Sequence, residues 1–183
     1  MEEVRATHPA KRLTLWFEDE ARVGQKGRTC HRWWTRGQRP PGLCDQRYTW
    51  VHVFAAVQPA TGEDFCLVLP HVSTEAMNVF LRDFGAGRAP DEHAVMVLDR
   101  AGWHGAHDLR VPANVTLVPL PPYSPELNPV ERVWLYLRER NLSHRLLDSY
   151  DAIVDAVCAA WNQLTPERLR SLTRYSYLEQ VNC

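Results

Sequence analysis

Three acidic side chains lie where the sequence predicts rigid elements. Asp19 and Asp99 each end an apolar run of the kind that forms a strand, and Glu131 falls in the first turn of a predicted helix. A stiff proline-rich approach, residues 121–125, fixes where that helix begins. Carboxylates held on rigid elements are the usual ligands of a divalent-metal site for phosphoryl transfer. Asp19, Asp99 and Glu131 are therefore the candidate catalytic and metal-binding residues.

Each aspartate also has a structural explanation when it is taken alone. Asp99 could cap a helix that begins near Gly102, because a short polar side chain accepts hydrogen bonds from the first turn of a helix. Asp19 lies between Glu18 and Glu20, which by strand alternation point to the opposite face. This acidic run could be no more than a solvated strand end. If the two strands are neighbours, however, both aspartates converge at one edge of the sheet.

Glu131 has a structural explanation of its own. Asn128 stands at the N-cap position of the predicted helix, Pro129 at the first helical position and Glu131 at the third, which is a capping-box arrangement. That arrangement accounts for a glutamate but not for the prolines before it. The stiff approach indicates that the carboxylate is placed at a defined point, and Val133 and Trp134 anchor the helix to the core.

Apolar periodicity predicts an α/β fold. Strand-like patterns occupy residues 13–19, 47–57, 65–69, 94–99 and 115–118. Helical patterns or capping signals occupy residues 74–84, 103–109, 129–140, 150–164 and a short stretch from residue 165. Residues 1–11 are expected to form a loose lead-in, and residues 21–46 a basic hairpin or loop excursion. Three strands followed by alternating helices and strands predict one mixed sheet with helices on both faces, in a single domain over residues 1–183.

The composition limits the class of protein. With 183 residues, 45% of them hydrophobic and 23% charged, the chain has the size and composition of a globular domain. No apolar run is long enough to span a membrane, so no membrane partner is expected. The five cysteines are odd in number and lack a C-x-x-C pair, which indicates free thiols in a reducing cytoplasm.

The net charge of −1 hides an uneven distribution. Residues 21–50 carry seven basic side chains and one acidic one, a net charge of +6, whereas residues 51–99 carry two basic and seven acidic ones, a net charge of −5. This suits a protein that grips phosphates in one place and metal ions in another, although a solvated basic hairpin would carry the same charge. The candidate nucleic-acid contacts are Arg28, Arg32, Trp33, Trp34, Arg36 and Arg39. For the two tryptophans, packing as anchors of the hairpin is favoured over stacking on bases.

Two histidines, His104 and His107, stand three residues apart on the predicted helix over residues 103–109. Such a pair could bind a metal ion, but a structural or supporting role is favoured.

Three sequence motifs together resemble a known family. They are Phe-Glu-Asp-Glu at residues 17–20, Val-Leu-Asp-Arg-Ala-Gly-Trp-His at residues 97–104 and Pro-Pro-Tyr-Ser-Pro-Glu-Leu-Asn-Pro-Val-Glu-Arg-Val-Trp at residues 121–134. Their order, and the 31 residues between Asp99 and Glu131, resemble the catalytic motifs of mariner-type DDE transposases, in the branch of bacterial insertion sequences of the 630 type. Residues 34–40 resemble the segment that these proteins carry between their first two strands.

The resemblance implies a ribonuclease-H-like fold and a DNA endonuclease and strand transferase for cut-and-paste transposition. It implies that Asp19, Asp99 and Glu131 hold two divalent ions, Mg²⁺ or Mn²⁺, and that the substrates are double-stranded transposon ends and target DNA. The active assembly is expected to be a homodimer, in the bacterial cytoplasm at the nucleoid. Arg100 stands where these proteins often have Asn, and His104 matches a position with an accessory role at the site.

The same resemblance sets an expectation for partners. The helix-turn-helix region that recognises transposon ends is missing before the first predicted strand, so the chain could be the second half of a split reading frame, a trimmed form of a longer protein or a remnant. In the first case a separately encoded N-terminal DNA-binding half would be a partner. For the same reason the chain could be a decayed or domesticated fragment that binds nucleic acid or a partner without cleaving it. Another ribonuclease-H-like nuclease is a further alternative, against which the proline-rich motif argues.

Overall fold

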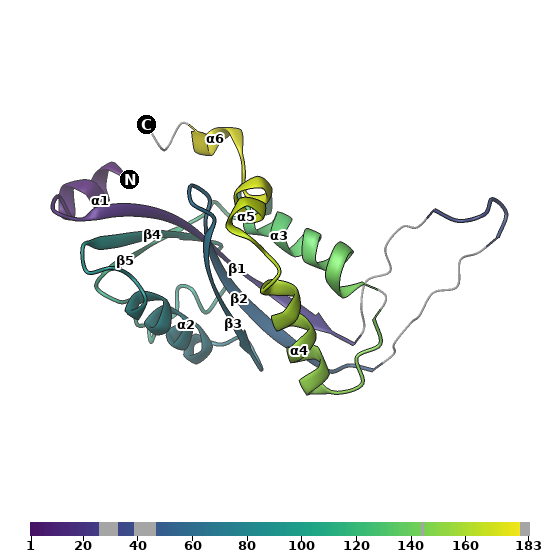
Figure 1. The fold of residues 1–183 in the computed structure, drawn as a ribbon. Helices are drawn as coiled ribbons and strands as arrows, with labels where there is room; N and C mark the ends of the chain where they lie inside the picture. Colours follow the sequence, from purple (N-terminus) through teal and green to yellow (C-terminus); the bar gives the residue numbers. More distant parts are fainter. Residues whose placement is uncertain (26–32, 39–46, 144, 180–183) are drawn as a thin grey trace.

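A five-stranded sheet forms the centre of the protein. The structure is a computed structural model, and it describes residues 1–25, 33–38, 47–143 and 145–179. The strands are β1 (Arg12–Gly24), β2 (Trp50–Gln58), β3 (Glu63–Leu69), β4 (Glu92–Leu98) and β5 (Val115–Pro119). They lie in the order β3-β2-β1-β4-β5, so the first strand of the chain is the central one (Figure 1).

The strand pairing confirms the predicted mixed sheet. β1 pairs antiparallel with β2, and β2 pairs antiparallel with β3. On its other side β1 pairs parallel with β4, and β4 pairs parallel with β5. The parallel pairing of β1 with β4 ends where Phe17 lies opposite Val97. Beyond that point β1 continues to Gly24, and among the described strands only β2 pairs with this part. The edge of β1 that faced β4 is therefore unpaired beside the end of β4.

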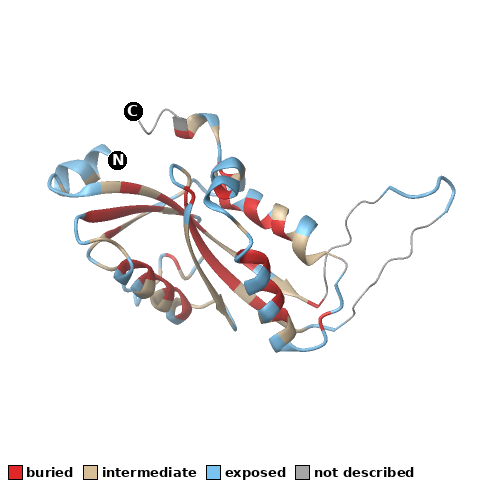
Figure 2. Cartoon of the chain, in the orientation of Figure 1, coloured by how far each residue is buried: buried red, intermediate tan, exposed pale blue. Residues whose placement is uncertain are grey.

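Helices cover both faces of the sheet, as the sequence predicts. Figure 1 shows α2 (Thr74–Ala86) on one face and α3 (Val130–Leu137), α4 (Tyr150–Trp161) and α5 (Pro166–Leu172) on the other. Successive β1 residues point to opposite faces, so Trp16 packs in the core beneath α2 and Phe17 in the core beneath α3 and α4. Buried residues accordingly concentrate on the strands and on the helix faces turned toward them (Figure 2).

Two segments differ from the sequence expectations. α1 (Glu2–Thr7) forms where a loose lead-in is predicted, with acidic residues in its first turn and Arg5 in its last, charges that favour a helix at both ends. Residues 103–109 form turns instead of the predicted helix. Gly105 lies in this segment and Gly102 directly before it, and glycine loses more conformational freedom in a helix than other residues do.

The C-terminal half differs in smaller details. The helix predicted over residues 129–140 is split: η1 (Pro125–Leu127) is a short 3-10 turn before it, α3 ends at Leu137, and the chain continues as a π-helical turn, η2 (Arg138–Leu142). A short helix, α6 (Ser176–Glu179), follows α5 and was not predicted. No helix in the described part of the chain is long and apolar enough to cross a membrane.

Candidate active site

Asp19 lies on β1 just past the point where its parallel partner stops. Phe17 pairs with Val97, so Asp19 follows two residues later on β1, and Asp99 follows two residues later just past the end of β4. The expectation that Asp19 ends its strand is wrong, because pairing with β2 carries β1 on to Gly24. The two aspartates nevertheless line the same cleft, as the predicted convergence at one edge of the sheet requires.

Asp99 is held by the chain that follows β4. Its Oδ1 accepts a hydrogen bond from the backbone N–H of Ala101 at 2.8 Å, a turn that an aspartate side chain commonly closes. Residues 99–114, all of them described, contain turns but no helix, so the alternative that Asp99 caps a helix near Gly102 is wrong. The side chain of Asp99 is 56% exposed, which leaves it accessible from the cleft.

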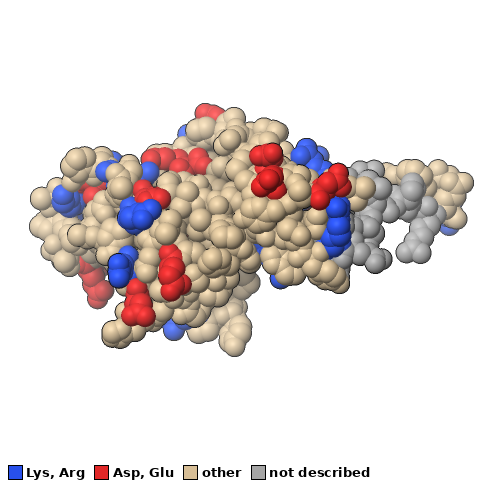
Figure 3. Space-filling view, turned by 90° about the horizontal axis from the view of Figure 1, so that it is seen from below, with Lys and Arg blue, Asp and Glu red and all other residues tan. Residues whose placement is uncertain are grey.

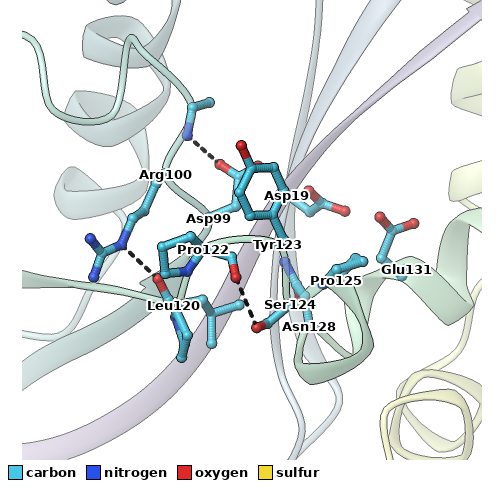
Figure 4. Close-up of a pocket in the computed structure, with 12 residues that line it drawn as sticks. Asp19, Asp99, Arg100, Leu120, Pro122, Tyr123, Ser124, Pro125, Asn128 and Glu131 are labelled. Carbon is cyan, nitrogen blue, oxygen red and sulfur yellow. Dashed lines mark hydrogen bonds between the residues drawn. The ribbon is translucent and has the colours of Figure 1, made fainter.

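Asn128 connects the start of α3 to the central strand. Its Nδ2 donates to the backbone carbonyl of Glu18 at 2.8 Å, and its Oδ1 accepts from the N–H of Val130 at 3.2 Å. The backbone N–H of Asn128 donates into the preceding 3-10 turn at 2.9 Å, so Glu131 does not close the capping box that the sequence suggests. Asn128 thus fastens α3 one residue away from Asp19, and the Glu131 carboxylate faces the cleft that holds this aspartate (Figure 4).

Trp134 contacts Asp19 directly. Its Nε1 donates to Asp19 Oδ2 at 2.8 Å, and its side chain is only 3% exposed. Trp134 stands three residues after Glu131, so one side of α3 carries both residues. The sequence identifies Trp134 only as a core anchor. A buried indole N–H needs a hydrogen-bond partner, and this requirement could have pointed to Asp19 on the strand beneath α3.

The three carboxylates line one cleft of about 390 Å³. Figure 4 shows Asp19 and Glu131 turned toward the same space, with Asp99 beside them. Arg100 and residues 120–125 line the remaining walls. Arg100 Nε donates to the carbonyl of Leu120 at 2.8 Å, so the guanidinium is held at the cleft wall.

Tyr123 stands at the rim of this cleft in a left-handed backbone conformation. Its φ is 57°, the only positive φ of a non-glycine residue in the described part of the chain. Its side chain is fully exposed. A non-glycine residue in this region costs about 1 kcal/mol or more. The proline-rich loop therefore presents an aromatic ring to solvent at a conformational cost, and sequence reasoning did not single it out.

Burial and charge repulsion perturb the acidic groups. The pKa of Asp19 is raised to about 8, first by burial and next by the negative charge of Glu131, while the hydrogen bond from Trp134 opposes the shift. The raised pKa shows that the fold disfavours the ionised form of Asp19, and a divalent cation bound between the carboxylates would favour that form. A donor set made only of carboxylate oxygens fits hard ions such as Mg²⁺ or Mn²⁺.

His104 is buried beside the cleft and contacts two acids. Its Nδ1 lies 2.9 Å from Asp99 Oδ1, and its Nε2 lies 3.0 Å from Glu20 Oε1. Burial lowers the pKa of His104, but the hydrogen bond and charge of Glu20, together with Asp99, outweigh burial and leave the pKa raised. The His107 side chain is fully exposed, so the expectation of a histidine pair on one helix is wrong.

The predicted nucleic-acid contacts are only partly described. Arg28, Arg32 and Arg39 lie outside the described residues. Trp33, Trp34 and Arg36 are exposed, and the Trp33 ring is fully exposed. Packing of Trp33 as a hairpin anchor is therefore wrong. A large exposed aromatic ring is what stacking on another molecule would use.

Comparison with known sequences finds one matching protein family and a similar bacterial protein. The sequence profile of the family described as DDE superfamily endonuclease matches residues 14–154. A protein of Sinorhizobium fredii (strain NBRC 101917 / NGR234), described as the uncharacterized protein y4pE/y4sA, is 49% identical over 118 residues, which cover 64% of this chain and 87% of that protein.

Comparison with solved structures supports the fold. The Mos1 mariner paired-end complex with Mn has a TM-score of 0.69 at 14% identity, covering 87% of this chain and 51% of the Mos1 chain. The Mos1 transposase paired-end complex with the left transposon end has a TM-score of 0.66 at 16% identity, covering 94% and 55%. The chain thus spans about half the length of the Mos1 chains that it matches. The ribonuclease-H-like fold expected from the sequence resemblance is confirmed.

Proposed function

The chain belongs to the family of DDE superfamily endonucleases, and from this premise we propose that it is the catalytic domain of a cut-and-paste transposase. Asp19, Asp99 and Glu131 would be its catalytic carboxylates, in a metal-dependent cleavage of DNA at transposon ends and the joining of the cut strand to target DNA. The observation that carries the proposal is that these three residues line one cleft, delivered by two adjacent strands and by a helix tied to the central strand.

The acidic cleft fits the divalent cations that this chemistry needs. Asp19, Asp99 and Glu131 would hold two Mg²⁺ or Mn²⁺ ions, and the raised pKa of Asp19 reflects the burial and repulsion that such ions would relieve. When bound, the ions would activate a water or a terminal 3′-OH and stabilise the leaving oxygen of the phosphodiester.

The chain's own groups keep the carboxylates in position. Trp134 holds Asp19 Oδ2, and because this hydrogen bond favours the charged form, it helps keep the carboxylate available as a ligand. The Ala101 N–H holds Asp99 Oδ1. Glu131 depends on Asn128, whose bond to β1 fixes the start of α3. This arrangement supports positioning, the main contribution that a protein makes to phosphoryl transfer.

Double-stranded DNA is the proposed partner, bound by a homodimer with a separately encoded DNA-recognition half. The fold neighbours described as complexes with transposon ends support DNA as the substrate. Figure 3 shows acidic and basic side chains interspersed over one face of the described surface, so no general basic field dominates there. Phosphate contacts would come from Arg100 in the cleft wall and from arginines of the excursion, such as Arg36.

Single changes at the three carboxylates test the proposal. Asp19→Asn, Asp99→Asn and Glu131→Gln should each abolish Mn²⁺-dependent nicking of supercoiled plasmid, while cooperative unfolding persists. Glu126→Gln is a matched control, because Glu126 is an exposed glutamate on the turn before α3 and does not line the cleft.

The outcomes separate the alternatives. Cleavage retained by any one of the three variants removes that residue from the site. A parent protein that binds DNA but never nicks it, in Mg²⁺ or Mn²⁺, supports the non-cleaving fragment. Cleavage confined to RNA–DNA hybrids supports a different nuclease.

A further inference from the structure

A second group of metal-binding side chains lies behind the cleft, on the opposite face of β1. Glu18 and Glu20 alternate with Asp19 along the strand and therefore point toward the face that carries α2. His104 reaches the same place from the turn after β4. One ligand atom from each of these three residues lies within 4.8 Å of the other two. None of the three belongs to the proposed catalytic triad.

The Glu18 carboxylate lacks the hydrogen-bond partners that a buried carboxylate normally has. Its side chain is fully buried, and neither carboxylate oxygen has a hydrogen-bond partner among the described residues. The carboxylate is aimed at His104, with Oε2 3.6 Å from Nε2. A buried carboxylate without partners is costly unless a cation or a proton neutralises it. The sequence reading of Glu18 as part of a solvated strand end is therefore wrong.

The distances from His104 Nε2 to the two glutamate oxygens are close to those between ligand atoms of a tetrahedral metal site. His104 Nε2 lies 3.0 Å from Glu20 Oε1 and 3.6 Å from Glu18 Oε2. Metal–ligand bonds of about 2.1 Å in a tetrahedral site put neighbouring ligand atoms about 3.4 Å apart. These two distances lie on either side of that value, so small side-chain movements would place the three ligand atoms at three corners of a tetrahedral site.

The surroundings of the three residues orient them as metal ligands. His104 Nδ1 lies 2.9 Å from Asp99 Oδ1 and 3.2 Å from the Asp99 carbonyl, so a proton on Nδ1 has acceptors. Nε2 faces the two glutamates and is within hydrogen-bond distance of Glu20, a contact that a bound ion would replace. Trp103 Nε1 donates to Glu20 Oε1 at 2.6 Å. A histidine that ligates through one nitrogen and donates from the other to a carboxylate is the usual arrangement at protein metal sites.

We propose that Glu18, Glu20 and His104 form a binding site for one divalent transition-metal ion of the Zn²⁺ class. One imidazole and two carboxylates suit such an ion better than Mg²⁺, which prefers oxygen ligands alone. Two carboxylates also balance its charge in this buried position. His104, but neither glutamate, also lines a second cleft of about 400 Å³.

The site has a consequence for the acidic cleft. An ion bound at Nε2 fixes the ring of His104, and Nδ1 of that ring holds Asp99. The ion would thus set the position of one candidate catalytic carboxylate from behind. The binding proposal itself does not depend on the proposed DNA cleavage, because its ligands and its test are separate.

Metal binding to a protein without the triad tests the proposal. In the double variant Asp19→Asn/Glu131→Gln, titration with Co²⁺ should give one bound ion with visible d–d absorption typical of nitrogen and oxygen ligands, and Zn²⁺ should displace it. Adding His104→Gln or Glu18→Gln should weaken binding at least about 100-fold, because each removes a ligand. Adding Trp103→Phe should weaken it about 10- to 100-fold, because it removes the donor that orients Glu20.

Two controls keep the result interpretable. His107→Gln, at a fully exposed histidine, should leave Co²⁺ affinity unchanged. Glu18→Gln preserves side-chain shape. If circular dichroism shows that His104→Gln is unfolded, Glu18→Gln still separates loss of a ligand from loss of the fold. Absence of bound Co²⁺ in the double variant overturns the proposal and means that His104 Nε2 simply donates to Glu20. Binding that survives both His104→Gln and Glu18→Gln overturns it too.

Discussion

Replacing Asp19 with asparagine should stabilise the metal-free protein, and more so at high pH. The pKa of Asp19 is raised to about 8 in the fold by burial and by Glu131, whereas an aspartate in an unfolded chain titrates near about 3.9. Between these values the folded state keeps a proton that the unfolded state has released. The fold therefore loses stability as pH rises through this window, by up to about 1.4 kcal/mol per pH unit for this group.

The size of the effect follows from the two pKa values. Between pH 5 and pH 8 the Asp19 carboxyl should cost the fold on the order of 3 kcal/mol, because at the upper pH the folded group is about half ionised. Asparagine does not titrate, so the difference in unfolding free energy between the variant and the parent should widen by this amount. With a urea m value of about 2 kcal/mol per M, the midpoint difference grows by roughly 1.5 M.

The assay is urea unfolding followed by circular dichroism in EDTA, at pH 5 and pH 8, for the parent and Asp19→Asn. Burial raises the pKa of Glu18 in both proteins, but the charge of Asp19 adds to that shift only in the parent, so Glu18 widens the gap in the same direction. Asp108→Asn controls for the loss of one charge, at a side chain that is 94% exposed. If the gap between variant and parent is the same at both pH values, the reasoning from burial and repulsion is refuted.

Three further changes test other contacts of the site. Trp134→Phe removes the donor that favours the charged form of Asp19, so the pKa of Asp19 should rise further. The pH profile of Mn²⁺-dependent nicking should then move to higher pH. An unmoved profile would show that the indole only packs. Asn128→Ala leaves a buried strand carbonyl without its partner and should cost about 1–3 kcal/mol in thermal or urea unfolding, with a larger loss in nicking rate than in DNA affinity. Arg32→Ala combined with Arg36→Ala should weaken binding to all DNA sequences alike and lower the slope of log affinity against log salt by about one for each lost phosphate contact; an unchanged slope in a salt titration would assign the segment a structural role.

The sequence was sufficient where one pattern had one structural reading. The apolar run that ends at Asp99 predicted the strand β4, and alternation in β1 correctly separated Asp19, which contacts Trp134, from Glu20, which contacts His104. Adjacent parallel strands then had to bring Asp19 and Asp99 to the same edge. The strand assignments need only local periodicity, whereas the adjacency of β1 and β4, on which the convergence depended, comes from the structure.

The sequence was insufficient where a contact joins residues far apart in the chain. The link from Asn128 to the carbonyl of Glu18 spans 110 residues, and the hydrogen bond from Trp134 to Asp19 spans 115. No periodicity reports such pairs. Local propensity also misled: Asn128 and Glu131 have the spacing of a capping box, but the preceding 3-10 turn takes the N–H of Asn128, and the Val130 N–H takes its Oδ1.

The rigidity of the acidic cleft is uneven. Asp19 and Glu131 belong to one mechanical unit, because Asn128 and Trp134 join α3 to the central strand at two points. Asp99 lies just past the end of β4, on a segment of turns, and its side chain is more than half exposed. In the proposed reaction the site accepts first water and then a DNA 3′ end, which requires some freedom to adjust. We expect that freedom at Asp99, because turns and not a helix or strand carry it, so crosslinking the turn after β4 should slow one step of the proposed reaction more than the other, whereas reinforcing α3 should slow neither.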